Sequence, residues 1–259
     1  MASQLFDMAG KNVLITGSSK GIGLAIAQEM ARAGAQVVIS SRKAEVCDRV
    51  AAAINTELEG KPGGAVAIPA HIGDKAALEL LVTQTLEQLG PIDVLVCNAA
   101  VNPFYGASKD IPDSAFQKVL NINIQSNHWL CHMVLPGMVE RGDGAIVVIS
   151  SIGGLRGSVD LGAYAISKAA DVQLVRNLAA EYGPHNVRVN AVSPGLVRTD
   201  FARALWENPE TLKKRTENDP LRRIGEPEEI AGIVVYLGSR AGNFTTGQNF
   251  VIDGGATSC

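Results

Sequence analysis

The chain has 259 residues, of which 46% are hydrophobic and 19% are charged. This composition can support a large core and excludes a disordered or low-complexity chain. The formal net charge of −3 and the isoelectric point near 5.8 lack the basic excess that nucleic acid or anionic lipid requires of a partner. A small molecule is therefore the expected partner.

The N-terminal residues and the cysteines carry no targeting or bonding signal. Residues 1–10 lack the basic region and apolar run of a secretory leader, and no stretch approaches the ~20 apolar residues that span a bilayer. The four cysteines, Cys47, Cys97, Cys131 and Cys259, are widely spaced and form no C-x-x-C pair. We therefore expect a cytoplasmic protein with reduced thiols, no metal site and no membrane association.

Apolar, β-branched runs alternate with longer amphipathic segments along the chain. Strands are predicted at Asn12–Thr16, Gln36–Ser41, Ala65–Ile68, Ile92–Cys97, Ala145–Ser150, Val187–Val192 and Asn249–Ile252. Helical spacing of apolar residues predicts helices at Gly21–Ala33, Lys75–Leu89 and Phe116–Leu135. This alternation predicts an α/β Rossmann fold, with a doubly wound, parallel, seven-stranded sheet and helices on both faces. No linker or repeat divides residues 1–259, so a single domain is expected.

A glycine-rich turn follows the first predicted strand directly and opens the first helix. Glycine lets the backbone bend sharply and approach a pyrophosphate, while the helix N-terminus offers free N–H groups. A plain strand-to-helix loop can have the same composition, so the turn alone is weak evidence. The turn residues expected to contact a dinucleotide are Gly17, Ser19, Lys20, Gly21, Ile22 and Gly23.

The second strand ends in a sequence that favours NADP over NAD. A chain that binds NAD usually places a carboxylate there, on the adenosine ribose, whereas this one has Ser41, Arg42 and Lys43. The guanidinium of Arg42 can bind a 2′-phosphate, and Lys20 can add a second positive charge. The alternative is that Arg42 and Lys43 begin a solvated helix.

Tyr164 and Lys168 are four residues apart, which makes them neighbours on one face of a helix. Free tyrosine has a pKa near ~10 and is a poor base at neutral pH, so a nearby positive charge is needed to make a phenolate accessible. Lys168 can supply that charge. The pair alone is a common pattern, and it gains meaning only from its context.

Three other polar residues converge on the same place. Ser151 ends the predicted fifth strand, thirteen residues before Tyr164, and Asn98 ends the fourth. Both therefore lie at the carboxyl edge of a parallel sheet, where ligands of α/β folds bind. Asn123 is an amide inside an otherwise apolar helical stretch. Together these residues predict one site.

In their order and spacing, these motifs resemble the short-chain dehydrogenase/reductase family. The resemblance rests on the glycine turn, Cys97-Asn98-Ala99-Ala100, Ser151, Tyr164 and Lys168, Ser193-Pro194-Gly195 and Val251-Ile252-Asp253-Gly254-Gly255, and it covers nearly the whole chain. It implies a catalytic tetrad of Asn123, Ser151, Tyr164 and Lys168. Within the family, the segments at 40–43 and 98–104 look like the NADP-dependent carbonyl and retinal reductases of the dehydrogenase/reductase branch.

The resemblance also implies which residues hold NADPH or NADP+. Besides the glycine turn, these are Ser41, Arg42, His71, Ile72, Asn98, Tyr164, Lys168, Pro194, Gly195, Val197 and Thr199. The chain departs from the family pattern at three of the positions discussed. Cys97 and Ala100 replace the first Asn and the Gly of the usual Asn-Asn-Ala-Gly, and His71 replaces the usual Asp beside adenine.

The implied reaction is hydride transfer from NADPH to a carbonyl carbon, giving an alcohol. Tyr164 would protonate the developing alkoxide, and Ser151 would hydrogen-bond the same oxygen. Lys168 would bind the nicotinamide ribose, and Asn123 would anchor a water that relays protons. The small-molecule substrate is then a ketone, an aldehyde or the corresponding alcohol.

Three functions remain open from the sequence. The first is a carbonyl reductase or alcohol dehydrogenase for hydrophobic ketones, steroids or retinoids. The second is a 3-oxoacyl-carrier-protein reductase, for which Arg156 and the basic clusters at 213–215 and 222–223 could dock an acidic protein. The third is a non-catalytic NADP(H)-binding scaffold.

The polar segment 199–225 and the oligomeric state are the least determined features. The segment is either a lid that covers the substrate or a solvated surface excursion. A homotetramer is expected from the family, and Gly247, Gly254 and Gly255 flank a last strand that could pack closely on a partner.

Overall fold

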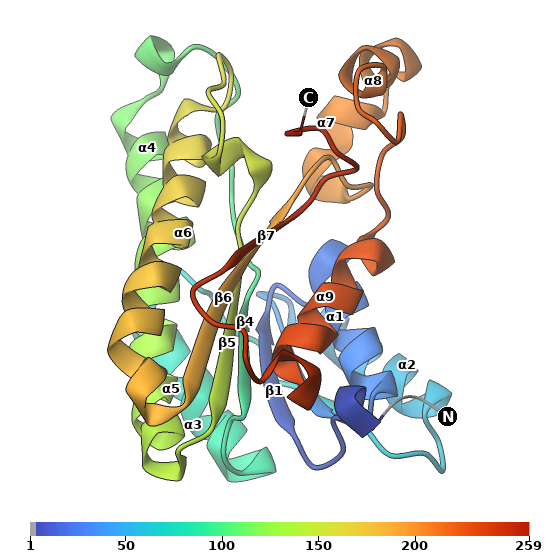
Figure 1. The fold of residues 1–259 in the computed structure, drawn as a ribbon, viewed down its shortest axis with the longest axis vertical. Helices are drawn as coiled ribbons and strands as arrows, with labels where there is room; N and C mark the ends of the chain where they lie inside the picture. The colour runs from blue at the N-terminus through green and yellow to red at the C-terminus, as the bar shows by residue number, and fades with distance from the viewer. Residues whose placement is uncertain (1–3, 259) are drawn as a thin grey trace.

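The computed structural model describes residues 4–258, which form one α/β unit around a seven-stranded sheet (Figure 1). The strands are β1 Asn12–Thr16, β2 Gln36–Ser40, β3 Gly64–Ala67, β4 Val94–Cys97, β5 Gly144–Ile149, β6 Val187–Pro194 and β7 Asn249–Ile252. The α-helices are α1 Gly21–Arg32, α2 Ala44–Glu57, α3 Lys75–Leu89, α4 Asp113–Leu120, α5 Ser126–Arg141, α6 Gly162–Tyr182, α7 Arg203–Trp206, α8 Pro209–Thr216 and α9 Pro227–Gly238. Short 3-10 turns and one π-helical turn, Asn121–Gln125, complete the elements.

All neighbouring strands are parallel, in the order β3-β2-β1-β4-β5-β6-β7. The order reverses between β1 and β4, because the chain first builds outward to β3 and then returns to the other side of β1. Ligands of such sheets bind beyond the carboxyl ends of the strands at this switch point. The fold therefore brings the end of β1 beside the end of β4.

The sheet is covered on both faces, as Figure 1 shows with the sheet between two groups of helices. Alternate strand residues face opposite sides, so Val13 and Ile15 pack with α1, α2 and α9, whereas Leu14 packs with α3, α5 and α6. Because both faces are buried, the strands are almost continuously apolar rather than alternating. The predicted single-domain Rossmann fold with a parallel seven-stranded sheet is confirmed.

Several predicted strand boundaries differ from the observed ones by one or two residues. β2 ends at Ser40, β3 and β5 each begin and end one residue earlier than predicted, and β4 begins only at Val94. β6 extends two residues further, to Pro194, because Ser193 and Pro194 pair with β7. Asp93, just before β4, binds the neighbouring strand through its side chain as well, because its carboxylate accepts a hydrogen bond from the Asn12 backbone N–H at 2.8 Å.

The helix predicted at Phe116–Leu135 is present, but it is longer than predicted and contains a π-helical turn. It consists of α4, the π-helical turn Asn121–Gln125 and α5, which extends to Arg141. A π turn inserts one extra residue into a helix and is frequent at functional sites. The apolar spacing alone could not indicate it, because the extra residue is held by contacts of Asn123 with distant parts of the chain.

The segment that follows β6 folds into short helices. It contains the 3-10 turn Asp200–Ala202, α7 and α8, which lie together beyond the carboxyl ends of the strands (Figure 1). Its two ends are joined at the base, because Arg198 N–H donates to Gly225 O and Gly225 N–H donates to Leu196 O, both at 2.9 Å. Trp206 Nε1 donates to Thr199 O at 2.9 Å and packs against Arg198.

Candidate functional site

The glycine turn is tied to the end of β4 by a small set of hydrogen bonds. Thr16 Oγ1 accepts from the backbone N–H of Asn98 at 3.0 Å and from that of Ala99 at 3.1 Å. Asn98 Nδ2 in turn donates to Thr16 O at 2.9 Å and to Gly17 O at 3.1 Å. Asn98 therefore shapes the phosphate turn through its side chain, which goes beyond the cofactor contact expected from the sequence.

Glycine is required at three positions of this turn. Gly17 and Gly21 adopt φ values of +65° and +57°, in the left-handed region that L side chains rarely occupy. A Cβ on Gly23 would lie 2.4 Å from Gly17 O and 2.5 Å from Asn98 Nδ2. The turn thus leaves its backbone open at the N-terminus of α1, which is a geometry that fits a pyrophosphate.

The candidate adenosine end of the site is open and basic. Arg42 is exposed just beyond β2, and Lys20 is exposed on the turn, where its Nζ lies 3.2 Å from Asp200 Oδ2. The hydrogen bond and charge of Lys20, together with Arg203, hold the pKa of Asp200 below its usual value. Residues 40–43 include no carboxylate that could bind a ribose 2′-hydroxyl.

The remaining residues predicted at this end have local partners. Ser41 Oγ lies 3.2 Å from Cys47 Sγ and is half-buried. His71 is exposed after β3, and its Nδ1 accepts from the Gly73 N–H at 3.2 Å. Ile72 is half-buried beside it and packs against the core.

Ser151 and Tyr164 lie at the carboxyl edge of the sheet, one after β5 and the other in the first turn of α6. Ser151 Oγ accepts from the Gly153 N–H at 3.0 Å, which fixes the hydroxyl at the start of a 3-10 turn. The ring of Tyr164 is half-buried, and its centroid lies 5.8 Å from that of Phe201 in the 199–225 segment. A Cβ on Gly153 would lie 3.4 Å from Ser151 Oγ and 3.8 Å from Tyr164 Cε1, so both side chains border the same small space.

Lys168 extends beneath Tyr164 and is almost completely buried, with 1% of its surface exposed. Its Nζ lies 5.8 Å from the Tyr164 ring centroid, donates to Ile149 O at 2.8 Å and pairs with Asp171 Oδ2 at 2.9 Å. Burial is the largest single influence and lowers the pKa of Lys168, but the charges of Asp171 and Tyr164 and the hydrogen bond to Asp171 together raise the pKa above its usual value. The amine is therefore a buried ammonium at neutral pH.

Asn123 occupies the π-helical turn and is fully buried. Its Oδ1 accepts from Val101 N at 2.8 Å, and its Nδ2 donates to Val101 O at 3.0 Å and to Ser167 Oγ at 3.0 Å. Ser167 Oγ donates to Tyr164 O at 2.7 Å. The amide thus connects the loop after β4 to the turn of α6 that carries Tyr164.

Asp171 is a site residue that the sequence reasoning missed. It is fully buried, and its two oxygens bind Lys168 Nζ and Asn127 Nδ2, the latter at 3.0 Å. The available signal was an acidic residue three positions after Lys168, on the apolar face of α6 next to Val172. An unpaired carboxylate is almost never fully buried, so its position in the pattern already required a cationic partner.

Four of the predicted cofactor residues, Pro194, Gly195, Val197 and Thr199, lie where β6 leaves the sheet. Gly195 N–H donates to Ile252 O at 2.9 Å, and a Cβ on Gly195 would lie 2.8 Å from Asp253. Pro194 ends β6, and Val197 forms an isolated bridge with Gly225. Thr199 lies against the phosphate turn: a Cβ added to Gly21 would be 3.2 Å from Thr199 Cγ2.

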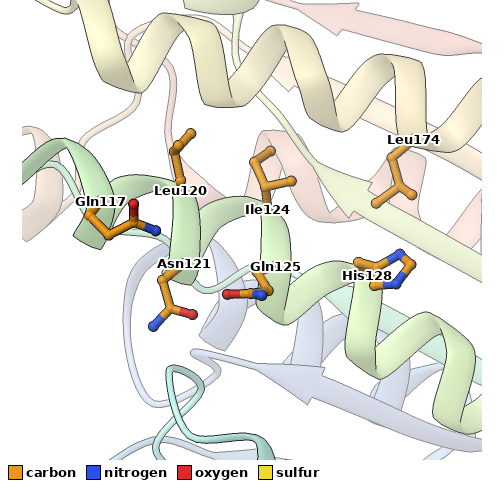
Figure 2. A pocket seen from close by; sticks show the side chains of 7 residues that line it. All are labelled: Gln117, Leu120, Asn121, Ile124, Gln125, His128 and Leu174. Carbon is orange, nitrogen blue, oxygen red and sulfur yellow. The ribbon is translucent and has the colours of Figure 1, made fainter.

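Two cavities lie away from these residues. One of about 410 Å³ is lined by Gln117, Leu120, Asn121, Ile124, Gln125, His128 and Leu174. Figure 2 shows its Leu120 and Ile124 directed toward α6, with Asn121 directed away from it. The other, of about 660 Å³, adjoins the amino ends of β4 and β5 and includes Asp93 and Arg188. Neither includes Ser151 or Tyr164, so the candidate site is identified by its chemical groups.

Residues 4–258 contain neither a metal-binding cluster nor a helix that could span a membrane. Among residues 4–258, no three His, Cys, Asp or Glu side chains are grouped to hold a metal ion. Cys47, Cys97 and Cys131 are free and buried, whereas Cys259 lies outside the described residues. In the same part of the chain, no helix is both long and apolar enough to cross a membrane.

Comparison with known proteins identifies the family. A family model described as enoyl-(acyl carrier protein) reductase matches residues 17–257. Dehydrogenase/reductase SDR family member 4 of Oryctolagus cuniculus is 41% identical over 251 residues, which are 97% of this chain and 95% of the relative. The chain belongs to the short-chain dehydrogenase/reductase family. The sequence motifs resemble this family of oxidoreductases and, within it, the dehydrogenase/reductase branch. Both resemblances are confirmed by the named relatives.

Solved structures of the short-chain dehydrogenase/reductase fold match the whole chain but differ in cofactor and substrate. A 3-oxoacyl-(acyl-carrier-protein) reductase from Agrobacterium tumefaciens C58, with NADP bound, has 32% identity and a TM-score of 0.90 over 98% of this chain and 97% of that one. A 7α-hydroxysteroid dehydrogenase with NADH and 7-oxo glycochenodeoxycholic acid has 33% identity, a TM-score of 0.90 and the same coverage. The fold is thus shared by relatives that use either nucleotide.

Proposed function

We propose that this protein is an NADPH-dependent reductase that converts the carbonyl group of an apolar ketone or aldehyde to an alcohol, reversibly. One observation carries the proposal. Ser151 and Tyr164 border one small space, and the Lys168 ammonium lies beneath Tyr164. Phe201 packs against the Tyr164 ring, and Thr199, two residues earlier in the chain, lies against the phosphate turn. A hydroxyl, a phenol and an ammonium are then grouped beside an open turn that fits a dinucleotide.

The residues of the turn and of the neighbouring loops fit NADPH. Gly17, Gly21 and Gly23 give the turn the shape that a pyrophosphate requires, and Arg42 offers a cation for a 2′-phosphate. Lys20 offers a second cation, which would have to exchange its ion pair with Asp200 for the phosphate. The cofactor would supply the hydride. The protein residues would bind it, orient the carbonyl and deliver the proton.

Tyr164 is the group that would give its phenolic proton to the carbonyl oxygen as negative charge develops there. Ser151 would donate a hydrogen bond to the same oxygen, and it is oriented for this because its own Oγ is already fixed by the Gly153 N–H. The Lys168 ammonium stabilises the phenolate that remains. A phenol that has lost its proton must regain one before the next turnover.

Asn123 would contribute to that proton return through its backbone. All three side-chain hydrogen bonds of Asn123 go to Val101 and Ser167. Its main-chain oxygen accepts from Asn127 Nδ2 at 2.7 Å and has a second lone pair. We therefore place the expected relay water at this oxygen, not at the amide.

The exposed rim of the site favours an apolar substrate. Large apolar side chains line the loops that follow three adjacent strands: Tyr105 after β4, Leu155 and Val159 after β5, and Phe201 and Leu221 after β6. Each of them is 44–81% exposed. Apolar residues gathered around a catalytic tyrosine are typical of a binding site for an apolar molecule. The segment 199–225 carries two of them and is the proposed substrate-covering segment.

The competing function is a 3-oxoacyl-carrier-protein reductase, the activity of one structural relative. Its docking surface would be basic, and Arg156, Lys213 and Lys214 are exposed near the rim. Arg223 is already bound by Glu229 at 2.7 Å. The cationic surface is therefore smaller than the sequence indicates, and the apolar rim favours a small ketone.

A substrate panel tests the proposal. NADPH oxidation is followed with cyclic ketones, aromatic ketones, retinal and an acetoacetyl thioester. We expect the ketones or retinal to give the higher kcat/KM. Faster turnover of the thioester would favour the competing function, and NADPH binding without turnover of any compound would favour a non-catalytic scaffold.

Tyr164→Phe tests the mechanism in the same assay. We expect kcat to fall by about 1000-fold because general acid–base catalysis contributes factors of that order. NADPH binding, measured by fluorescence titration, should persist. Tyr182→Phe is the matched control, since it removes a phenol at the other end of α6, and it should keep wild-type turnover. Wild-type rates in Tyr164→Phe would refute the assigned role.

A further inference from the structure

Lys168 and Asp171 form a buried ion pair one turn apart on α6. Their side chains are 2% and 0% exposed, and Nζ lies 2.9 Å from Asp171 Oδ2. The second oxygen of Asp171 accepts from Asn127 Nδ2 on α5. Each oxygen of the Asp171 carboxylate thus has a hydrogen-bond partner that holds the side chain in place.

Among residues 4–258, Lys168 is the one charged group that acts on Asp171. From β4, Cys97 faces the pair, and contact with Cys131 of α5 together with burial raises the pKa of the Cys97 thiol, so it stays neutral. From α5, Asn127 is a neutral amide, and from β5 the Ile149 carbonyl accepts from Lys168. Burial raises the pKa of Asp171, while the bonds from Lys168 and Asn127 oppose that rise.

The same ammonium faces Tyr164. Its Nζ lies 5.8 Å from the tyrosine ring centroid and 2.9 Å from the carboxylate, so the anion is the nearer partner. In a buried site, Coulomb interactions extend over several ångströms with little screening. The negative charge of Asp171 therefore cancels part of the positive field that Lys168 exerts on the phenol.

We propose that Asp171 is a positioning residue that anchors the Lys168 ammonium and offsets its charge, so that Tyr164 stays a protonated donor up to a higher pH than it would beside an unpaired lysine. This inference rests on the proposed roles of Tyr164 and Lys168. It adds a fifth residue, held by Asn127, that acts on the chemistry through the lysine without touching the substrate.

The test measures ionisation of Tyr164 directly. The chain has four tyrosines, so the near-ultraviolet absorbance of phenolate is titrated in the purified full chain and in Tyr164→Phe, and the difference reports Tyr164. In Asp171→Asn, we expect the midpoint of that difference to fall by about one pH unit, the size of a buried charge interaction at this range. Asp171→Glu, which keeps the charge, should return the midpoint toward the wild-type value.

Glu181→Gln is the matched control, because it removes one negative charge from the exposed end of the same helix. Burial, together with the hydrogen bond and charge of Glu181, raises the pKa of the neighbouring Tyr182, so only the Tyr164 difference signal of this variant, and not its total titration, should coincide with that of the wild type. Loss of Asp171 also removes the main influence that opposes the effect of burial on the pKa of Lys168. An Asp171→Asn midpoint that coincides with the wild type, or that rises because Lys168 has become a neutral amine, overturns the proposal. If Asp171→Asn does not fold, as judged by circular dichroism, Asp171→Ser carries the same expectation, and failure of both to fold would assign the pair to stability alone.

A kinetic arm separates this inference from the proposed function. With NADP+ and 1-phenylethanol, the pH at which kcat/KM for oxidation is half-maximal should fall in Asp171→Asn by the same amount as the titration midpoint. A shifted titration in a protein that turns over no compound of the panel would support the role of Asp171 and refute the carbonyl reductase. Turnover with an unshifted titration would do the reverse.

Discussion

The buried floor of the candidate site and its exposed rim are built in different ways. The floor consists of Asn123, Lys168 and Asp171, which are at most 1% exposed and have every polar group paired within the described chain. The rim includes Phe201 and Val159, which are 55% and 81% exposed and lie on loops and short turns. The contrast teaches that, under the proposed function, packed elements would hold the chemical groups in place, whereas exposed side chains on loops would contact the substrate.

The two regions also differ in how they respond to change. A floor residue cannot move without breaking hydrogen bonds that link α5, α6 and the loop after β4, so its replacement affects the whole site. A rim side chain has few partners, so its replacement changes only the surface that a ligand would cover. Three substitutions test this difference, from the largest expected effect to the smallest.

Gly23→Ala, in the phosphate turn, should have the largest effect. The new Cβ would lie 2.4 Å from Gly17 O, so the phosphate turn must deform. Overpacking of this kind costs about 3 kcal/mol, which corresponds to a ~100-fold weaker Kd for NADPH in a fluorescence titration. Gly183→Ala is the control, because a Cβ there meets nothing within 4 Å. Equal affinity in the two variants would show that the turn does not bind the cofactor.

Arg42→Ala should have an intermediate effect, confined to one nucleotide. A charge-assisted hydrogen bond is worth about 2 kcal/mol, so the Kd for NADPH should rise ~30-fold while that for NADH stays unchanged. Arg49→Ala, an exposed arginine on α2, is the control. An equal loss for both nucleotides would remove Arg42 from the 2′-phosphate site.

Phe201→Ala, on the rim, should have the smallest effect. Removing part of the apolar surface beside Tyr164 should raise KM for an aromatic ketone about tenfold, with little change in the Kd for NADPH. Phe244→Ala is the control, because Phe244 is fully exposed and lies between α9 and β7. If Phe201→Ala lowered NADPH affinity instead, the 199–225 segment would belong to the cofactor site and not to the substrate rim.

The sequence by itself determined the fold class and the family, and it predicted the residues of the candidate site with the exception of Asp171. Apolar runs between amphipathic helices require a covered parallel sheet, and the glycines at 17, 21 and 23 are needed where no other residue fits the backbone. Those signals are local, since they depend on neighbours in the chain. The NADP preference, the homotetramer and the cytoplasmic location are also predictions from the sequence, and they remain predictions.

Only the tertiary structure decided how the site is held together. The helix predicted at 116–135 contains a π turn because Asn123 binds Val101 and Ser167, which are 22 and 44 residues away along the chain. Asn98 shapes the phosphate turn because β1 and β4 become neighbours. Asp171 can be buried because α5 supplies Asn127 and its own helix supplies Lys168. Such contacts join residues far apart in sequence, so no local pattern of residue types specifies them.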